Sequence, residues 1–156
     1  MDVMLLLEYE HEVVRGLLEL ITEGPRHGAE RKRTLLTRMA EVLRLHSAVE
    51  CVIMSRMLSR SLVRRVDEVV LHACLQEHQT LVHWLLPGVI ASDPESTVFD
   101  GRIRVLRATF EKLSRDEEAA FLPLISRVLK PNEVEAIGRE VGALDLLRHA
   151  PRDSEM

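Results

Sequence analysis

The sequence has few aromatic residues, few cysteines and no excess of positive charge, and each of these features argues against a class of protein. Aromatic residues make up 3% of the 156 residues, which leaves few platforms on which nucleic-acid bases could stack. The formal net charge is −4, so the chain lacks the excess of basic residues that is typical of a nucleic-acid-binding protein. The two cysteines are too few for a disulfide scaffold, and we expect a reducing compartment.

Long apolar runs and strand patterns are also missing. The N-terminal stretch MDVMLLLEYEHEV carries no basic leader, and its apolar run ends at Glu8. The sequence therefore predicts neither a signal peptide nor a membrane span, and we expect a cytoplasmic protein without a membrane partner. No alternating run rich in Val, Ile or Thr is present, and no Asn-Gly or Asp-Gly turn, so strands are not expected.

The sequence instead has apolar residues at steps of three and four, which is the spacing of amphipathic helices. We predict four long helices, of which three span about residues 3–22, 33–59 and 100–129. The remaining one, third in chain order, begins within residues 61–66 and ends near residue 90. A short fifth helix should follow Pro131, with Asn132 as its N-cap, before a frayed tail. This pattern is typical of an all-α, up-down-up-down four-helix bundle. We expect a single domain over residues 1–156, with its core in 3–130.

The apolar residues of each of the four long helices form a stripe along one face of the helix. Each stripe is interrupted near its middle by a side chain that can bind a metal. The interruptions are His11 on the first helix, His46 and Glu50 on the second, His78 on the third and Glu117 on the fourth. Taken singly, each has an ordinary explanation. A histidine on a core face is usually hydrogen-bonded there, and a glutamate usually marks a stripe assigned in the wrong phase.

The positions of these residues along their helices favour a shared explanation. His11 lies thirteen residues before Gly24, and His46 lies thirteen residues after Arg33, at the two ends of the loop that joins their helices. In antiparallel neighbouring helices both side chains would then lie roughly 20 Å from that loop, and so at the same level. His78 and Glu117 are compatible with the same layer to within about one turn. Such buried groups would each cost roughly 2–7 kcal/mol if unpaired, against the ~5–15 kcal/mol stability of an ordinary domain. We therefore predict a metal site, because histidine and carboxylate are ligands of iron, zinc and manganese.

The chain resembles the hemerythrin-like (HHE cation-binding) family over about residues 3–130. The family has a histidine on helix one, His-x-x-x-Glu on helix two, a histidine on helix three, and His-x-x-x-Glu-Glu with an apolar-Pro ending on helix four. The matching segments here are EYEHEVV with His11, LHSAVE with His46 and Glu50, LQEHQTLVHWL with His78, and EEAAFLP with Glu117.

The resemblance implies a bundle core that holds one or two non-haem irons, bridged by carboxylates of the second and fourth helices and capped by histidines. By this analogy His11 and His46 would serve one metal, and His78 with the shared carboxylates would serve the other. The implied function is the sensing, storage or reversible binding of iron, O₂ or a related small oxidant. Zinc or manganese are the alternative metals.

Two departures from the family pattern leave the composition of the site open. Leu113 occupies the helix-four histidine position, four residues before Glu117. The third helix lacks the second stripe histidine of some family members, because positions 74 and 82 are Cys and Val. Either Cys74, Glu118 or a water fills the gap, or the site holds one metal firmly and the second weakly.

Other interpretations also stay open. A degenerate bundle with one structural metal or none would serve as a protein-interaction or regulatory module. An enzyme acting on peroxide or nitric oxide has no support beyond the metal itself, since no separate nucleophile or acid–base group accompanies the stripes. Glu8 and His11 have ferritin-like spacing, but that motif occurs once where two are needed. His72 and His83 are expected to face the flank or solvent. The sequence leaves the oligomeric state open, a homodimer included.

Overall fold

The computed structural model describes residues 2–23, 28–60 and 62–149, and from residue 144 onwards the backbone alone. Within these ranges the regular structure is helical and no strand occurs, which confirms the all-α prediction. None of the helices described combines the length and the apolar character that a membrane crossing requires. Residues 24–27 of the predicted first loop and 150–156 of the predicted tail lie outside the described residues.

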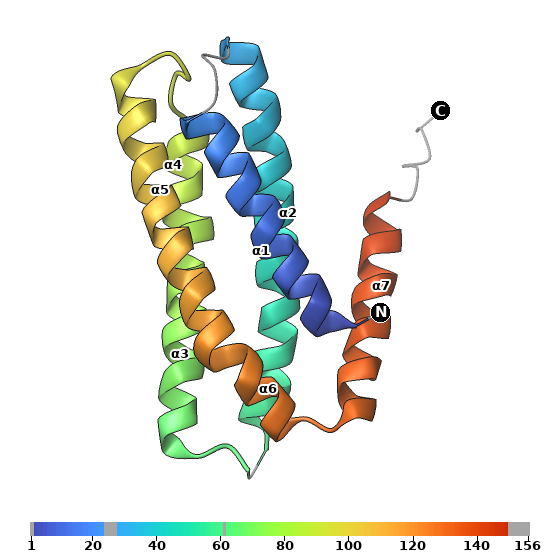
Figure 1. The fold of residues 1–156 in the computed structure, drawn as a ribbon. Coiled ribbons are helices and arrows are strands. Elements are labelled where there is room, and N and C mark those ends of the chain that lie inside the picture. Colours follow the sequence, from blue (N-terminus) through green and yellow to red (C-terminus); the bar gives the residue numbers. More distant parts are fainter. Residues whose placement is uncertain (1, 24–27, 61, 150–156) are drawn as a thin grey trace.

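Long helical columns stand side by side, with the last helix against one flank (Figure 1). In chain order the elements are α1 (Val3–Thr22), α2 (Ala29–Leu58), α3 (Arg65–Gln79), the π-helix η1 (Thr80–Leu85), α4 (Leu86–Ile90), α5 (Thr97–Asp116), the π-helix η2 (Glu117–Phe121), α6 (Leu122–Val128) and α7 (Pro131–His149). α3, η1 and α4 form one continuous column, and so do α5, η2 and α6. α1 and α3 both contact α2 and α5, whereas α7 contacts α1 and α2.

The helix ends differ from the prediction mainly around α2 and α7. α2 begins at Ala29, four residues before its predicted start. α7 spans 19 residues, where a short helix was predicted. α7 begins at Pro131, so Lys130 and not Asn132 precedes its first residue, and the Glu133 and Val134 N–H groups donate to the Lys130 carbonyl. Pro131 takes the first helical position, where a missing N–H costs nothing. The Lys130 N–H then donates to the Glu133 carboxylate at 2.8 Å.

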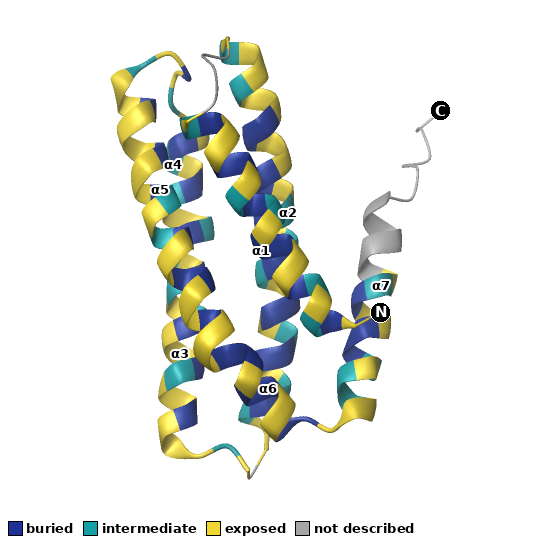
Figure 2. Cartoon of the chain, viewed as in Figure 1, coloured by how far each residue is buried: buried dark blue, intermediate teal, exposed yellow. Residues whose placement is uncertain are grey.

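The core lies between the columns, whose inward faces are the buried ones (Figure 2). All three phenylalanines of the sequence, Phe99, Phe110 and Phe121, are buried there. The predicted stripe of the second helix is buried throughout and is confirmed; its members are Met39, Leu43, His46, Glu50, Ile53 and Met57. The predicted stripe of the fourth helix is confirmed as well, with Leu106, Phe110, Leu113, Glu117, Phe121 and Leu124 buried.

The two π-helical segments lie within the third and fourth columns. The Leu86 N–H donates to the Leu81 carbonyl and the Leu122 N–H to the Glu117 carbonyl, five residues back in each case. A proline follows each of these leucines, and a proline ring crowds the carbonyl of the preceding turn. The turn before it widens, which accounts for the π geometry at both places.

The predicted stripe of the third helix is partly wrong. Leu75, Val82 and Leu85 were expected in the core, but they are half-buried. Cys74 and Leu81 are buried instead. Up to residue 82, steps of three and four fit either set, so the spacing alone could not choose between them. The extra residue in the π-helical turn then rotates the chain, so that the core face resumes one position later than a regular helix would place it.

Candidate metal centre

The five predicted site residues meet in one layer of the core. His11 comes from α1, His46 and Glu50 from α2, His78 from α3, and Glu117 from the first position of η2. Each is at most 3% exposed. Five titratable groups are thus removed from water together, and each needs a partner inside the protein.

Glu117 lies at the centre of the cluster and faces both of its sides. Its Oε2 lies 2.7 Å from Nε2 of His11 and 3.4 Å from Nε2 of His46. Its Oε1 lies 2.5 Å from Nε2 of His78 and 3.5 Å from Sγ of Cys74. The two oxygens of one carboxylate therefore serve two different groups of donors.

Glu50 is divided in the same way. Its Oε1 lies 3.2 Å from Nε2 of His46. Its Oε2 contacts Nε2 of His78 and lies 3.8 Å from Sγ of Cys74. The cluster consequently contains two donor groups that share both carboxylates, and within each group the ligand atoms lie within 4.8 Å of one another. The first group is His11, His46, Glu50 and Glu117, and the second is Glu50, Cys74, His78 and Glu117.

The outward nitrogens of the imidazoles have partners of their own. Nδ1 of His11 lies 2.9 Å from Oε1 of Glu118, which also accepts a hydrogen bond from Arg15 at 2.8 Å. Nδ1 of His78 lies 2.9 Å from the Ser47 hydroxyl. These contacts orient the rings so that Nε2 points inward, which is the usual way in which proteins prepare histidine for a metal.

The outer partner of His46 is Glu10, a residue that sequence reasoning missed. Glu10 is buried, its Oε1 lies 3.8 Å from Nδ1 of His46, and neither of its oxygens has a hydrogen-bond partner. A signal for it exists in the sequence. Val3, Leu7, Glu10 and Val14 follow steps of three and four, so Glu10 interrupts a second line of the same apolar face.

Electrostatics within the cluster favour positive charge between the carboxylates. Burial lowers the pKa of His46, but the charge of Glu50 and the hydrogen bond to Glu117 raise that pKa well above its ordinary value. Burial also lowers the pKa of His78, and the same two carboxylates raise it to about 9. Burial raises the pKa of Glu117, yet hydrogen bonds from the three imidazoles bring it well below its ordinary value. Imidazolium protons or a metal cation can supply the required charge.

The donor atoms could hold a metal ion, and one of the inward oxygens has no hydrogen-bond partner within the cluster. Oε1 of Glu50 is buried without a hydrogen-bond partner, although it lies close to Nε2 of His46. The two atoms approach at a suitable distance without the alignment of a hydrogen bond, as ligands directed at a common point do. Imidazole, carboxylate and thiol together form a donor set for iron, zinc or manganese.

The structure also places Leu113, which occupies the position of the missing histidine, and the two residues that were considered as its replacements. Leu113 is buried one turn before Glu117 and offers no ligand atom. Glu118 belongs to neither donor group, because it lies on the outer side of the His11 ring. Cys74 belongs to the second group. Burial, together with the charges of Glu50 and Glu117, raises the pKa of its thiol.

The two histidines that were expected to face the flank or solvent, His72 and His83, are exposed, as predicted.

One cavity reaches the second donor group from the surface. It has a volume of about 270 Å³, lies between α3 and η2, and has both Cys74 and Glu117 in its wall. Three alanines line it as well, Ala73, Ala119 and Ala120. Small side chains therefore leave a route from the outside of the protein to one half of the cluster.

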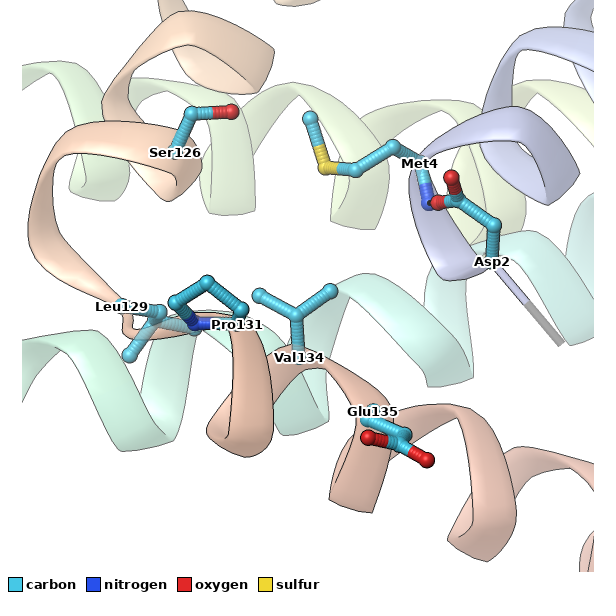
Figure 3. Close-up of a pocket in the computed structure, with 7 residues that line it drawn as sticks. All are labelled: Asp2, Met4, Ser126, Leu129, Pro131, Val134 and Glu135. Atoms are coloured by element: carbon cyan, nitrogen blue, oxygen red, sulfur yellow. Dashed lines mark hydrogen bonds between the residues drawn. The ribbon is translucent and has the colours of Figure 1, made fainter.

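A separate cavity of about 460 Å³ lies where the start of α1, the end of α6 and the start of α7 meet (Figure 3). Met4 and Val134 point into it, and Asp2 and Glu135 lie at its margin. None of the five predicted site residues lines this cavity. It is distinct from the candidate metal centre.

No protein-family model, curated protein or solved structure matches the chain. The function is therefore inferred from the chain's own residues.

Proposed function

We propose that this protein is a hemerythrin-like, up-down-up-down four-helix bundle that binds non-haem iron through His11, His46, Glu50, His78 and Glu117. Its function is to bind, sense or store iron, O₂ or a related small oxidant. The observation that carries the proposal is the division of both carboxylates between two groups of donors. Glu117 presents Oε2 to His11 and Oε1 to His78, and Glu50 divides its oxygens between His46 and His78.

A structural role alone does not account well for this arrangement. Two carboxylates and three imidazoles could in principle satisfy one another through shared protons. In that case each oxygen should end in an aligned hydrogen bond, since buried polar groups normally do. Oε1 of Glu50 has none.

The protein's own residues would hold, orient and shield the ions. The three Nε2 atoms and the two carboxylates would provide the ligands, and Glu118 and Ser47 would orient two of the rings. Phe110 packs its ring edge against His11, with centroids 6.0 Å apart, and excludes water from that side. When bound, iron would supply redox chemistry towards O₂ or a related oxidant, whereas zinc would supply none.

Element-specific metal analysis tests the proposal. The protein would be loaded anaerobically with Fe(II), desalted and analysed for iron, zinc and manganese, with His46→Ala as the site variant. We expect one or two irons per wild-type chain and a clear loss in His46→Ala, because that histidine belongs to the first donor group. His83→Ala removes an exposed histidine and serves as the matched control. Wild-type protein that retains no more metal than His46→Ala would refute the proposal.

Leu113 is the observation that favours the alternative, a single-metal or metal-free interaction module. It places a buried hydrocarbon side chain where the family has a nitrogen ligand. Thermal unfolding identifies the metal-free form of this module, which would unfold at the same temperature with and without a chelator and would retain no iron. A module with one structural metal would instead unfold at a lower temperature in the chelator and would retain at most one ion per chain.

A further inference from the structure

The second donor group contains a sulfur atom at position 74, one of the two positions where some members of the resembled family have a second histidine. Cys74 lies on α3, one turn before His78, and is 7% exposed. Its Sγ lies 3.5 Å from Oε1 of Glu117 and 3.8 Å from Oε2 of Glu50. These are the same two oxygens that face His78. Sulfur, imidazole and two carboxylate oxygens therefore surround one point.

The ordinary explanation of a buried cysteine is that it packs as a small hydrophobic side chain. Cys74 does belong to the buried apolar cluster, and Ala73 and Phe121 line the same cavity. Packing alone does not account for the surroundings of its sulfur, which lies 3.8 Å from a carboxylate oxygen of Glu50 and 3.5 Å from one of Glu117. A sulfur ligand would complete the second group.

We propose that Sγ of Cys74 is a ligand of the metal position formed by His78, Glu50 and Glu117. The inference rests on the proposed function and deepens it, because it makes the two metal positions chemically different. The position of His11 and His46 offers two nitrogens, and the position of Cys74 offers one nitrogen and one sulfur. On coordination the thiol loses its proton to solvent and binds as the thiolate. The second position should accordingly prefer thiophilic divalent ions such as Zn²⁺ or Co²⁺ over Mn²⁺.

The sulfur-containing position is also the one beside the cavity between α3 and η2. Cys74 and Glu117 line that cavity, whereas His11 and His46 do not. An ion or small molecule that enters by this route meets the Cys74 position first.

Cobalt substitution tests the proposal, because a cysteine thiolate bound to Co(II) gives an intense near-ultraviolet charge-transfer band. Metal-free wild type, Cys74→Ser and Cys51→Ser would be titrated with Co(II). Cys51 is exposed on α2, so its variant is a matched control. We expect the band in the wild type and in Cys51→Ser and its loss in Cys74→Ser. The affinity of the second position for Co(II) should fall about tenfold or more in Cys74→Ser.

Alkylation of the wild type gives a second readout that needs no variant to fold. Iodoacetamide labelling with and without bound Co(II), located by peptide mass spectrometry, should show protection of Cys74 by the metal and none of Cys51. Bound Co(II) without the charge-transfer band, or equal labelling of Cys74 in both states, would overturn the Cys74 assignment and leave the proposed function standing. If the wild type bound neither Co(II) nor Fe(II), the proposed function and the inference would both fail.

Discussion

At the scale of single residues, the three histidines of the cluster differ in what holds them from outside. His11 is backed by a carboxylate that is itself paired with an arginine, and His78 by a serine hydroxyl. His46 faces the buried Glu10 at a distance longer than a hydrogen bond. A carboxylate partner makes an imidazole a stronger ligand, so the outer residues should set the affinity of the site.

A substitution at Glu118 tests whether the outer partner of a histidine affects the metal affinity, because it leaves every proposed ligand in place. We expect Glu118→Gln to weaken metal binding about 10–100-fold, because the amide keeps the shape of the side chain but loses its charge. Competition with a chromophoric chelator measures the affinity. Glu41→Gln, an exposed carboxylate on α2, is the control. Equal affinities in all three proteins would show that the contact with His11 has no effect on the metal.

The residues of the site differ in how well the sequence reveals them. His11, His46 and Glu117 are recognisable because a strongly polar side chain on an apolar stripe demands an explanation. Cys74 is not recognisable in this way, since cysteine is compatible with the core whether or not it binds a metal. Ser47 lies next to His46 in the chain but contacts His78, a pairing that only the packing of two helices discloses.

At the scale of elements, α3 begins with a network that ties it to α6. The Asp67 carboxylate accepts hydrogen bonds from the Arg64 N–H at 3.0 Å and from its Nε at 3.1 Å. It also pairs with Arg127 of α6 at 2.8 Å. The hydrogen bond from the Arg64 side chain is the main cause that lowers the pKa of Asp67 far below its usual range. Burial acts in the opposite direction, and the hydrogen bond and charge of Arg127 lower the pKa further.

This pKa shift predicts a pH dependence of stability. A carboxyl group with a lowered pKa in the folded state stabilises the protein above its unfolded pKa of about 3.9, and the contribution is lost as the pH falls further, towards the folded pKa. Asp67→Asn should therefore lower the melting temperature at pH 7, and its difference from the wild type should shrink progressively below about pH 4.

Thermal unfolding followed by circular dichroism between neutral and acidic pH measures this difference. Glu68→Gln is the matched control, since Glu68 lies in the same first turn of α3 and is exposed. A deficit in Asp67→Asn that stayed constant as the pH fell would contradict the role of ionisation.

The helices themselves were largely predictable, and the exceptions have local causes. The stripe of the second helix was correct because a regular period persists over its length. The stripe of the fourth was correct although η2 lies within it, because its buried residues still follow steps of three and four. The third stripe failed around Leu75 and Val82, where a π-helical turn and a choice between two equally spaced sets both intervene. Sequence periodicity assumes a constant rotation per residue, and a π-helical turn breaks that assumption.

At the scale of the whole molecule, α7 is an integral part of the packing. Ile137 and Val141 are buried, and the helix contacts both α1 and α2. Ion pairs join Arg56 of α2 to Glu140, and Arg60 to Glu133. The prediction of a short C-terminal helix therefore underestimated the length of α7, which lies beside the N-terminal end of α1 (Figure 1).

We expect Ile137→Ala to destabilise the metal-free protein by about 2–5 kcal/mol, the usual cost of truncating a buried aliphatic side chain. Denaturant unfolding followed by circular dichroism in the presence of a chelator measures the change. Ile90→Ala makes the same substitution at a site that is 46% exposed, and its effect should stay within about 0.5 kcal/mol. A loss within about 0.5 kcal/mol in Ile137→Ala as well would contradict the role of α7 in the stability of the fold.

The position of Glu117 along the chain has a consequence for biosynthesis. Both donor groups contain this residue, and every other member of either group precedes it in the sequence. A nascent chain that has not yet released η2 from the ribosome carries neither complete group. A metal ion that needs either complete group could therefore be bound only after Glu117 has left the ribosome, and a truncated translation product ending before Glu117 would have no complete group.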